Sequence, residues 1–326
     1  MTAQHVIFLH GPTATGKSSL ALELASRFPI DLISVDSGQV YRGMEIGTAR
    51  LSEDLLAQFP HHLIGIRDVP EIFSVGDFCT LARFHIDEIL RRERIPLLVG
   101  GTMFYFSALL KGIPKLPAAD QELRQRLASD VRQNGLGTVY RRLQKMDPVS
   151  ANRIDSNDRQ RILRALEINI LTSNPVSECA SSDGLAKTGV KVSRISINVS
   201  DRRTLHRGID DRLRGMIDAG LIEEVRGIRS RYPQCRETPA MKSVGYKQVW
   251  SHLENEVDER QMIADIATAT RRLAKRQLTW LRHERGLTWF DASSGGLVSS
   301  VLGCGEYLDE RPSGLKLAWC GFRFRC

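Results

Sequence analysis

A strand, a glycine loop and a helix start follow one another at residues 6–18, and this pattern constrains the chain more than any other. Val6 to Leu9 form a short apolar run typical of a buried strand. Gly11 to Ser18 then read G-P-T-A-T-G-K-S, which matches G-x-x-x-x-G-K-[ST]. Apolar residues at helical spacing begin at Leu20, so a helix starts where the glycines end. The pattern predicts an α/β fold, a phosphate-loop parallel sheet flanked by helices.

The loop has the residue types that bind a di- or triphosphate. Backbone N–H groups around a helix N-terminus form a concave anion site, and the helix dipole favours negative charge there. Lys17 is expected on the outer phosphate oxygens, and the Ser18 hydroxyl is a candidate ligand for Mg²⁺. The alternative is a plain glycine turn before a helix. The candidate diphosphate-binding residues of the loop are Gly11, Pro12, Thr13, Ala14, Thr15, Gly16, Lys17 and Ser18.

Two further strands are expected to end beside this loop. Residues 31–35 form an apolar run that is followed by Asp36, and ligands bind beyond the carboxyl ends of strands in open α/β sheets. Asp36 is therefore a candidate site carboxylate, the alternative being a turn or helix-cap aspartate. A third run, 96–99, ends in Gly100-Gly101-Thr102, where an ATP hydrolase or motor would typically carry an acidic residue.

The hydrophobic pattern of the sequence changes after residue 117. Apolar residues now recur at helical spacing up to about residue 171, with many arginines, which predicts an inserted helical domain. Its basic surface is either simply solvated or a face for nucleic acid. We therefore expect a phosphate-loop core over 1–117, an inserted helical domain over 118–190 and completion of the core over 191–292. The tail, 293–326, remains unassigned.

The second half of the core carries more basic segments. Asp201 is expected to cap an arginine-rich helix, and residues 241–250 mix cations with aromatic residues that could stack on bases. A long helix over 258–283 has one apolar face and another that carries Arg271, Lys275 and Arg282. Such a helix suits contact with a sugar-phosphate backbone.

Composition narrows the class of protein. The chain has 326 residues, with 46 Lys and Arg against 38 Asp and Glu, and a formal net charge of +8 suits a polyanionic partner without proving one. Six scattered cysteines indicate neither a zinc site nor a disulfide framework. No signal peptide or membrane-spanning run is visible. We expect a cytoplasmic monomer that makes no membrane contact.

Seven segments together resemble one family, the bacterial tRNA dimethylallyltransferases, also called tRNA isopentenyltransferases. They occur in the family's order and cover roughly residues 5–292. The segments are 11–18, 33–42 (I-S-V-D-S-G-Q-V-Y-R), 43–49 (G-M-E-I-G-T-A), 100–105 (G-G-T-M-F-Y), 158–166 (D-R-Q-R-I-L-R-A-L), 243–247 (S-V-G-Y-K) and 275–282 (K-R-Q-L-T-W-L-R).

The resemblance implies a reaction. The loop would hold the diphosphate of dimethylallyl diphosphate, with Mg²⁺ as cofactor, and the acceptor would be N6 of the adenosine 3′ of the anticodon in tRNA. That base must leave its stack to reach the site. Asp36 and Thr102 would be the catalytic residues, and Arg212 would join the diphosphate site.

The same resemblance implies an extended tRNA surface and makes the inserted domain over 118–190 a tRNA-binding domain. The residues that would contact tRNA are Asp36, Ser37, Gly38, Gln39, Thr102, Arg124, Gln160, Arg161, Ile162, Leu163, Arg164, Lys242, Ser243, Val244, Gly245, Tyr246, Lys247, Lys275, Arg276, Gln277, Leu278, Thr279, Trp280, Leu281 and Arg282.

The chain departs from the family pattern at one position of interest. Gly208 stands where the family usually has the first of two arginines directed at the diphosphate, while Arg212 matches the second. Arg207 is a candidate substitute. The competing function is an ATP-dependent small-molecule phosphotransferase, which would turn over ATP without tRNA. A non-catalytic tRNA-binding protein would leave the phosphate loop unexplained.

Overall fold

The computed structural model describes residues 4–114, 116–117, 119–179, 183–293 and 296–303. The chain divides into two compact units. The first comprises the described residues within 1–110 and 185–326, and the second those within 111–184. The sequence-based domain boundaries, at 118 and 190, fall a few residues further along the chain.

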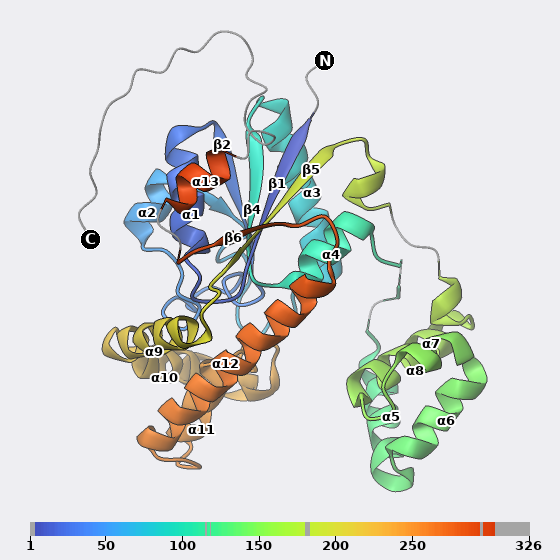
Figure 1. Ribbon diagram of the computed structural model, residues 1–326. Coiled ribbons are helices and arrows are strands. Elements are labelled where there is room, and N and C mark those ends of the chain that lie inside the picture. The colour runs from blue at the N-terminus through green and yellow to red at the C-terminus, as the bar shows by residue number, and fades with distance from the viewer. Residues whose placement is uncertain (1–3, 115, 118, 180–182, 294–295, 304–326) are drawn as a thin grey trace. The chain divides into compact units, whose positions relative to one another are not determined.

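A six-stranded parallel sheet forms the centre of the first unit (Figure 1). The strand order is β3-β2-β4-β1-β5-β6. Because all pairs are parallel, all strands end at the same edge of the sheet. The strands are β1 (His5–His10), β2 (Ile30–Val35), β3 (His61–His62), β4 (Ile95–Gly100), β5 (Lys191–Asn198) and β6 (Thr288–Asp291).

Helices cover both faces of this sheet, as the alternation of side chains along β1 requires. Ile7 and Leu9 are buried in a core with helix α1 (Lys17–Arg27) and helix α13 (Leu297–Gly303). Phe8 and His10 face the other way, where both rings contact Phe106 of helix α4 (Met103–Lys111).

Helix α3 (Val75–Arg91) lies on the α4 side, where Phe78 stacks on Tyr105 with ring centroids 4.5 Å apart. The helix begins at a capping box that Ser74 and Asp77 form. Helix α2 (Glu53–Gln58) is shorter, and the Ser52 side chain caps its first turn.

Four helices gather beyond the carboxyl ends of the strands (Figure 1). They are α9 (Arg202–Asp218), α10 (Leu221–Arg231), α11 (Tyr246–Leu253) and α12 (Glu259–His283), with the short 3₁₀ helix η3 (Pro233–Glu237) between α10 and α11. Asp201 and Asp258 cap the first turns of α9 and α12 through their carboxylates. The contacts of α12 with α9 and α11 hold it beside the sheet edge.

The second unit is helical throughout its described elements. Its helices are α5 (Gln121–Asn134), α6 (Leu136–Met146), α7 (Pro148–Arg153), α8 (Arg159–Thr172) and the 3₁₀ helix η1 (Val176–Glu178). Their core is made of Leu123, Leu127, Leu143, Ile162 and Leu166, among others. The helical periodicity in the sequence predicts this packing. The 3₁₀ helix η2 (Leu185–Lys187) follows, in the first unit.

The structure corrects several local expectations. The aromatic rings of Tyr246 and Trp250 are 0% and 1% exposed, so they cannot stack on bases as the composition of residues 241–250 indicated. Both side chains lie on the buried face of α11 instead. Strand β6 and helix α13 were not expected from the sequence. No helix in the described ranges has both the length and the apolar character needed to cross a membrane.

Candidate active site

The glycine loop connects the end of β1 to the start of α1, as the sequence predicts. A Cβ atom on Gly11 would lie 2.6 Å from the carbonyl oxygen of Ile197 on the neighbouring β5, so only glycine fits there. Gly16, with φ of 80°, precedes the first residue of α1 and would meet nothing within 4 Å if it carried a Cβ. The loop is therefore held tightly at its start and is open above the helix N-terminus, where backbone N–H groups and the helix dipole favour an anion.

Gln277 of α12 ties this loop to the end of β4. Its Oε1 accepts a hydrogen bond from the backbone N–H of Thr13 at 3.0 Å. Its Nε2 donates to the carbonyl oxygen of Gly101 at 2.8 Å, and a Cβ on Gly101 would lie 2.5 Å from that nitrogen. The side chain is 8% exposed. One buried amide therefore fixes the distance between the phosphate loop and the Gly-Gly-Thr strand end, a role that sequence reasoning missed.

Two cations and one carboxylate share the site beside the loop. Burial and the neighbouring Arg212 guanidinium lower the pKa of Lys17 from its usual 10.5 to about 7, and Asp36 opposes that change. Burial also lowers the pKa of Arg212, again against the attraction of Asp36. Lys17 and Arg212 thus repel each other in the absence of an anion. A bound diphosphate would relieve that repulsion by lying between them.

The Asp36 carboxylate is fixed at the end of β2. Its Oδ1 accepts hydrogen bonds from the backbone N–H groups of Gly38 and Gln39, at 2.8 and 3.2 Å. The adjacent Ser37 N–H donates to Thr102 Oγ1 at 3.2 Å. Strand pairing between β2 and β4 brings Asp36 and Thr102 to the same edge of the sheet, as the sequence predicts. A proton acceptor and a hydroxyl group therefore stand next to the phosphate loop.

Glu224 of α10 holds the loop that packs against this turn. Its Oε2 accepts from the N–H groups of Glu45 and Ile46, at 2.9 and 2.7 Å. Its Oε1 accepts from the Gly47 N–H at 3.2 Å and from the Tyr246 hydroxyl at 2.6 Å. Burial is the main reason why the pKa of Tyr246 is raised, so the phenol stays a donor. No motif in the sequence singles out Glu224.

The loop held by Glu224 connects to the diphosphate side of the site through Thr48. The carbonyl oxygen of Thr48 accepts from Arg212 at 3.4 Å and from the Gln39 amide at 3.3 Å. Gln39 in turn accepts from the Ser34 hydroxyl at 3.0 Å. Glu224 therefore helps to position both Arg212 and the turn that carries Asp36.

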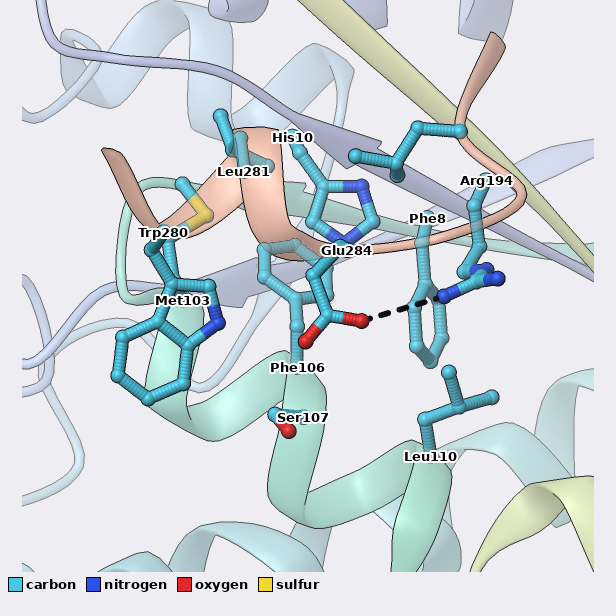
Figure 2. Close-up of a pocket in the computed structure, with 11 residues that line it drawn as sticks. Phe8, His10, Met103, Phe106, Ser107, Leu110, Arg194, Trp280, Leu281 and Glu284 are labelled. Atoms are coloured by element: carbon cyan, nitrogen blue, oxygen red, sulfur yellow. Dashed lines mark ion pairs between the residues drawn. The ribbon is translucent and has the colours of Figure 1, made fainter. Parts of the chain in front are cut away.

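A small apolar pocket lies behind the loop, between β1, α4 and the end of α12 (Figure 2). Burial lowers the pKa of His10 to about 4, so its imidazole is neutral there. Its Nδ1 lies 3.1 Å from the carbonyl oxygen of Ile195, to which it must donate. Arg194 and Glu284 form an ion pair at 3.6 Å that lines the same pocket (Figure 2). This packing supports the strand that leads into the phosphate loop.

The residues present fit a magnesium ion that is held mainly by phosphate oxygens. Among the described residues, no group of three or more His, Cys, Asp or Glu side chains could hold a metal. The Ser18 side chain is exposed on the first turn of α1, and within the described structure its hydroxyl has no hydrogen-bond partner. Mg²⁺ commonly keeps several water ligands and is held through substrate phosphates together with few protein oxygens.

Comparison with known proteins identifies the family to which this fold belongs. The family model described as IPP transferase matches residues 39–284. The chain belongs to the IPP transferase family. Two curated relatives are each named tRNA dimethylallyltransferase. The protein of Thiobacillus denitrificans is 45% identical over 293 residues, covering 90% of this chain and 93% of its own. The protein of Nitrosomonas europaea is 45% identical over 296 residues, covering 91% and 93%.

Solved structures of this family share the fold. The full-length tRNA isopentenylpyrophosphate transferase of Bacillus halodurans is 35% identical, with a TM-score of 0.67, and the match covers 92% of this chain and 94% of that one. A eukaryotic dimethylallyltransferase, described as acting on tRNA, is 25% identical with a TM-score of 0.74. That match covers 92% of this chain and 78% of the other. The fold class inferred from the sequence is confirmed.

In the second unit, the structure places the residues expected to contact tRNA in two different environments. Gln160 and Arg161 are exposed on the first turn of α8, whereas Ile162 is buried in the core and Leu163 packs against it. Helical geometry turns these apolar side chains inward, so we do not retain them as side-chain contacts to tRNA.

Two of the expected tRNA contacts in this unit are ion-paired arginines. Arg124 and Arg164 bond the carboxylate of Glu167, at 2.9 and 2.8 Å, although Glu167 itself is only 1% exposed. These hydrogen bonds hold the pKa of Glu167 below its usual value despite burial. Both guanidinium groups therefore have a structural partner within the unit.

The expected tRNA residues of α11 and the turn before it are also divided. Lys242 and Lys247 are exposed, with Lys242 paired to Glu237 at 3.0 Å. Ser243 and Val244 are half-buried, whereas Gly245 and Tyr246 are buried. Only the two lysines present a charge to solvent.

Helix α12 turns one side of segment 275–282 toward solvent and the other toward the core. Gln277 and Leu281 are buried, and Leu278 packs against a core cluster. Their side chains are therefore occupied within the protein. The exposed members of the segment are Lys275, Arg276, Thr279, Trp280 and Arg282.

Gly208 of α9 lies directly over the phosphate loop. A Cβ on this residue would be 3.7 Å from the carbonyl oxygen of Ala14. The neighbouring Arg207 is exposed and donates to Thr204 Oγ1 at 3.1 Å, on the surface of its own helix. In this structure Arg207 does not take the place next to the loop that Gly208 occupies.

Proposed function

We propose that this chain transfers a dimethylallyl group from dimethylallyl diphosphate to N6 of the adenosine immediately 3′ of the anticodon in tRNA, with release of pyrophosphate. The observation that supports it most is the fixed Asp36 carboxylate, next to Thr102 and within electrostatic reach of Lys17 and Arg212. The names of the relatives support the substrate class.

The exocyclic amine of adenosine is a poor nucleophile because its lone pair is delocalised into the ring. In the proposed step, Asp36 accepts a hydrogen bond from N6 and then takes its proton as N6 attacks C1 of the allyl group. The N6–C1 bond forms and the C1–O bond breaks, so the electron pair of that bond leaves with pyrophosphate. The hydrogen bonds of Asp36 to Gly38 and Gln39 keep the carboxylate in one orientation for this transfer.

Negative charge develops on the departing pyrophosphate, next to the phosphate loop and the positively charged groups beside it. Backbone N–H groups of the loop, protonated Lys17 and Arg212 would stabilise the departing pyrophosphate. Ser18 is the residue that would hold Mg²⁺, and the bound ion would neutralise part of the diphosphate charge. Gln277 keeps the loop in place through Thr13 while the charge develops.

The test follows radiolabel from dimethylallyl diphosphate into unmodified tRNA. Asp36→Asn keeps the size of the side chain and an oxygen for the two N–H groups but cannot accept the proton. We expect kcat to fall by about 10²–10⁴-fold, the range of general-base catalysis, with tRNA affinity little changed.

Asp31→Asn is the matched control, because Asp31 lies on β2, the strand that ends just before Asp36, but pairs with Arg92 and Arg94 away from the site. A near-normal rate for Asp36→Asn would remove Asp36 from the role of base. Turnover of ATP on a small molecule, without transfer of label to tRNA, would overturn the proposed function itself.

A further inference from the structure

Two large aromatic side chains are exposed and in contact beside the active-site edge. Phe104 of α4 is 50% exposed and Trp280 of α12 is 37% exposed. Their ring centroids are 6.4 Å apart, with an interplanar angle of 63°. Single exposed apolar residues are common and need no explanation. Two exposed aromatic rings in contact instead form one continuous apolar patch, a feature typical of a binding surface.

Each ring lies close in sequence to a residue of the site. Phe104 follows Thr102 by two residues, and the Thr102 hydroxyl accepts from Ser37 beside Asp36. Trp280 stands one helical turn after Gln277, which bonds the phosphate loop and Gly101. The two rings are thus carried by α4, which begins directly after Thr102, and by α12, which also carries Gln277.

The indole of Trp280 has support from the protein on one side. It lines the small pocket together with the buried Met103 and with Leu281 and Phe106 (Figure 2). This packing fixes the ring while part of its surface remains in solvent. A rigid aromatic ring with one supported side and one open side is suited to stacking with another planar group.

The charge around the pair is positive. Arg276 precedes Trp280 by four residues, so it lies on the same face of α12, and Arg272 lies one turn before that. Lys275 and Arg282 are exposed on the same helix. Within the part of the chain that the structure describes, none of these four cations forms an ion pair. Together the aromatic rings and free cations complement a single-stranded nucleic acid, whose bases stack while its phosphates carry negative charge.

We propose that Phe104 and Trp280 form a stacking platform for an unpaired anticodon-loop base that neighbours the target adenosine, with Arg276 on an adjacent phosphate. The inference rests on the proposed function and deepens it, because it adds Phe104 to the tRNA surface and specifies base stacking as the role of Trp280. When the target base leaves its stack, its neighbour loses a stacking partner. The platform replaces that partner and holds the loop open.

The test measures steady-state kinetics with an unmodified tRNA transcript as acceptor. Phe104→Ala and Trp280→Ala are each expected to raise KM for tRNA by about tenfold, within the range that stacking of one base on an aromatic ring provides. KM for dimethylallyl diphosphate should remain within twofold of the wild-type value. Trp280→Phe should restore most of the tRNA affinity, since it keeps an aromatic face.

Phe84→Ala is the matched control, because Phe84 is 56% exposed on α3 and belongs to no part of the site. A second readout uses an anticodon stem-loop with 2-aminopurine beside the target adenosine. Its fluorescence should be quenched on binding to the wild type and not to Trp280→Ala. This binding assay needs no turnover, so it remains informative even if the enzyme transfers no label.

Three results would overturn the platform. The first is an unchanged KM for tRNA in both alanine variants of an enzyme whose wild type modifies tRNA. The second is a parallel loss of affinity for dimethylallyl diphosphate, which would indicate a structural role. The third is a change in sedimentation with protein concentration that Trp280→Ala abolishes without altering KM for tRNA. That result would assign the patch to contact between two copies of the chain.

Discussion

Replacement of Gln277 by leucine tests whether one buried amide organises the diphosphate site. Leucine has a similar size but neither donates nor accepts a hydrogen bond, so the Thr13 N–H and the Gly101 carbonyl both lose their partner. A buried polar group without a partner costs about 1–3 kcal/mol. Both backbone groups belong to half-buried residues, so we take the lower limit for each and expect a loss of about 2 kcal/mol in the free energy of unfolding.

The same change should weaken binding of the donor. If the phosphate loop must be reordered when diphosphate binds, a cost of about 2 kcal/mol corresponds to a rise of at most about thirtyfold in KM for dimethylallyl diphosphate. Urea unfolding monitored by circular dichroism gives the stability, and label transfer at varied donor concentration gives KM. The expected pattern is a lower unfolding midpoint with an unchanged m-value, together with a higher donor KM.

Gln261→Leu provides a matched control on the same helix. Gln261 is exposed, and within the described residues its side chain bonds only Asp265, one turn further along α12. We expect its unfolding free energy to stay within about 0.5 kcal/mol of the wild type, as for most surface substitutions. The reasoning is refuted if Gln277→Leu matches this control in both stability and donor KM.

Two further predictions concern charge at the site. Because only protonated Lys17 attracts the diphosphate and its pKa is lowered to about 7, kcat/KM for dimethylallyl diphosphate should fall as pH rises through 7. Lys17→Arg should lack this step, and an identical profile for both enzymes would contradict the assignment. The same pKa, below the usual 10.5, predicts that the cost of charging Lys17 on folding is full below pH 7 and is relieved as pH rises toward 10.5. Glu224→Gln removes the carboxylate that accepts from three backbone N–H groups and from Tyr246, so urea unfolding should show a loss of about 2–3 kcal/mol. The exposed Glu223→Gln should change stability by less than about 1 kcal/mol, and equal effects of the two substitutions would exclude the anchoring role.

The sequence by itself determined the parts of the site that depend on local chemistry. The loop from Gly11 to Ser18 and the helix after it follow from residue types at fixed spacing, because glycine geometry and a helix N-terminus are local properties. The placement of Asp36 beside Thr102 also followed, since parallel strands that end in polar residues end at one edge of a sheet.

Only the tertiary structure decided which side chains are free to act. The hydrophobic periodicity of the sequence does not predict that Gln277 turns inward to bond Thr13 and Gly101. Nor does it predict that Glu224 accepts hydrogen bonds from the N–H groups of residues 45–47. Both arrangements depend on contacts between elements far apart in sequence. For the same reason Tyr246, which composition marked as a stacking residue, is buried, whereas Phe104 is exposed against Trp280. A sequence states which groups are present, and packing decides which of them meet solvent or one another.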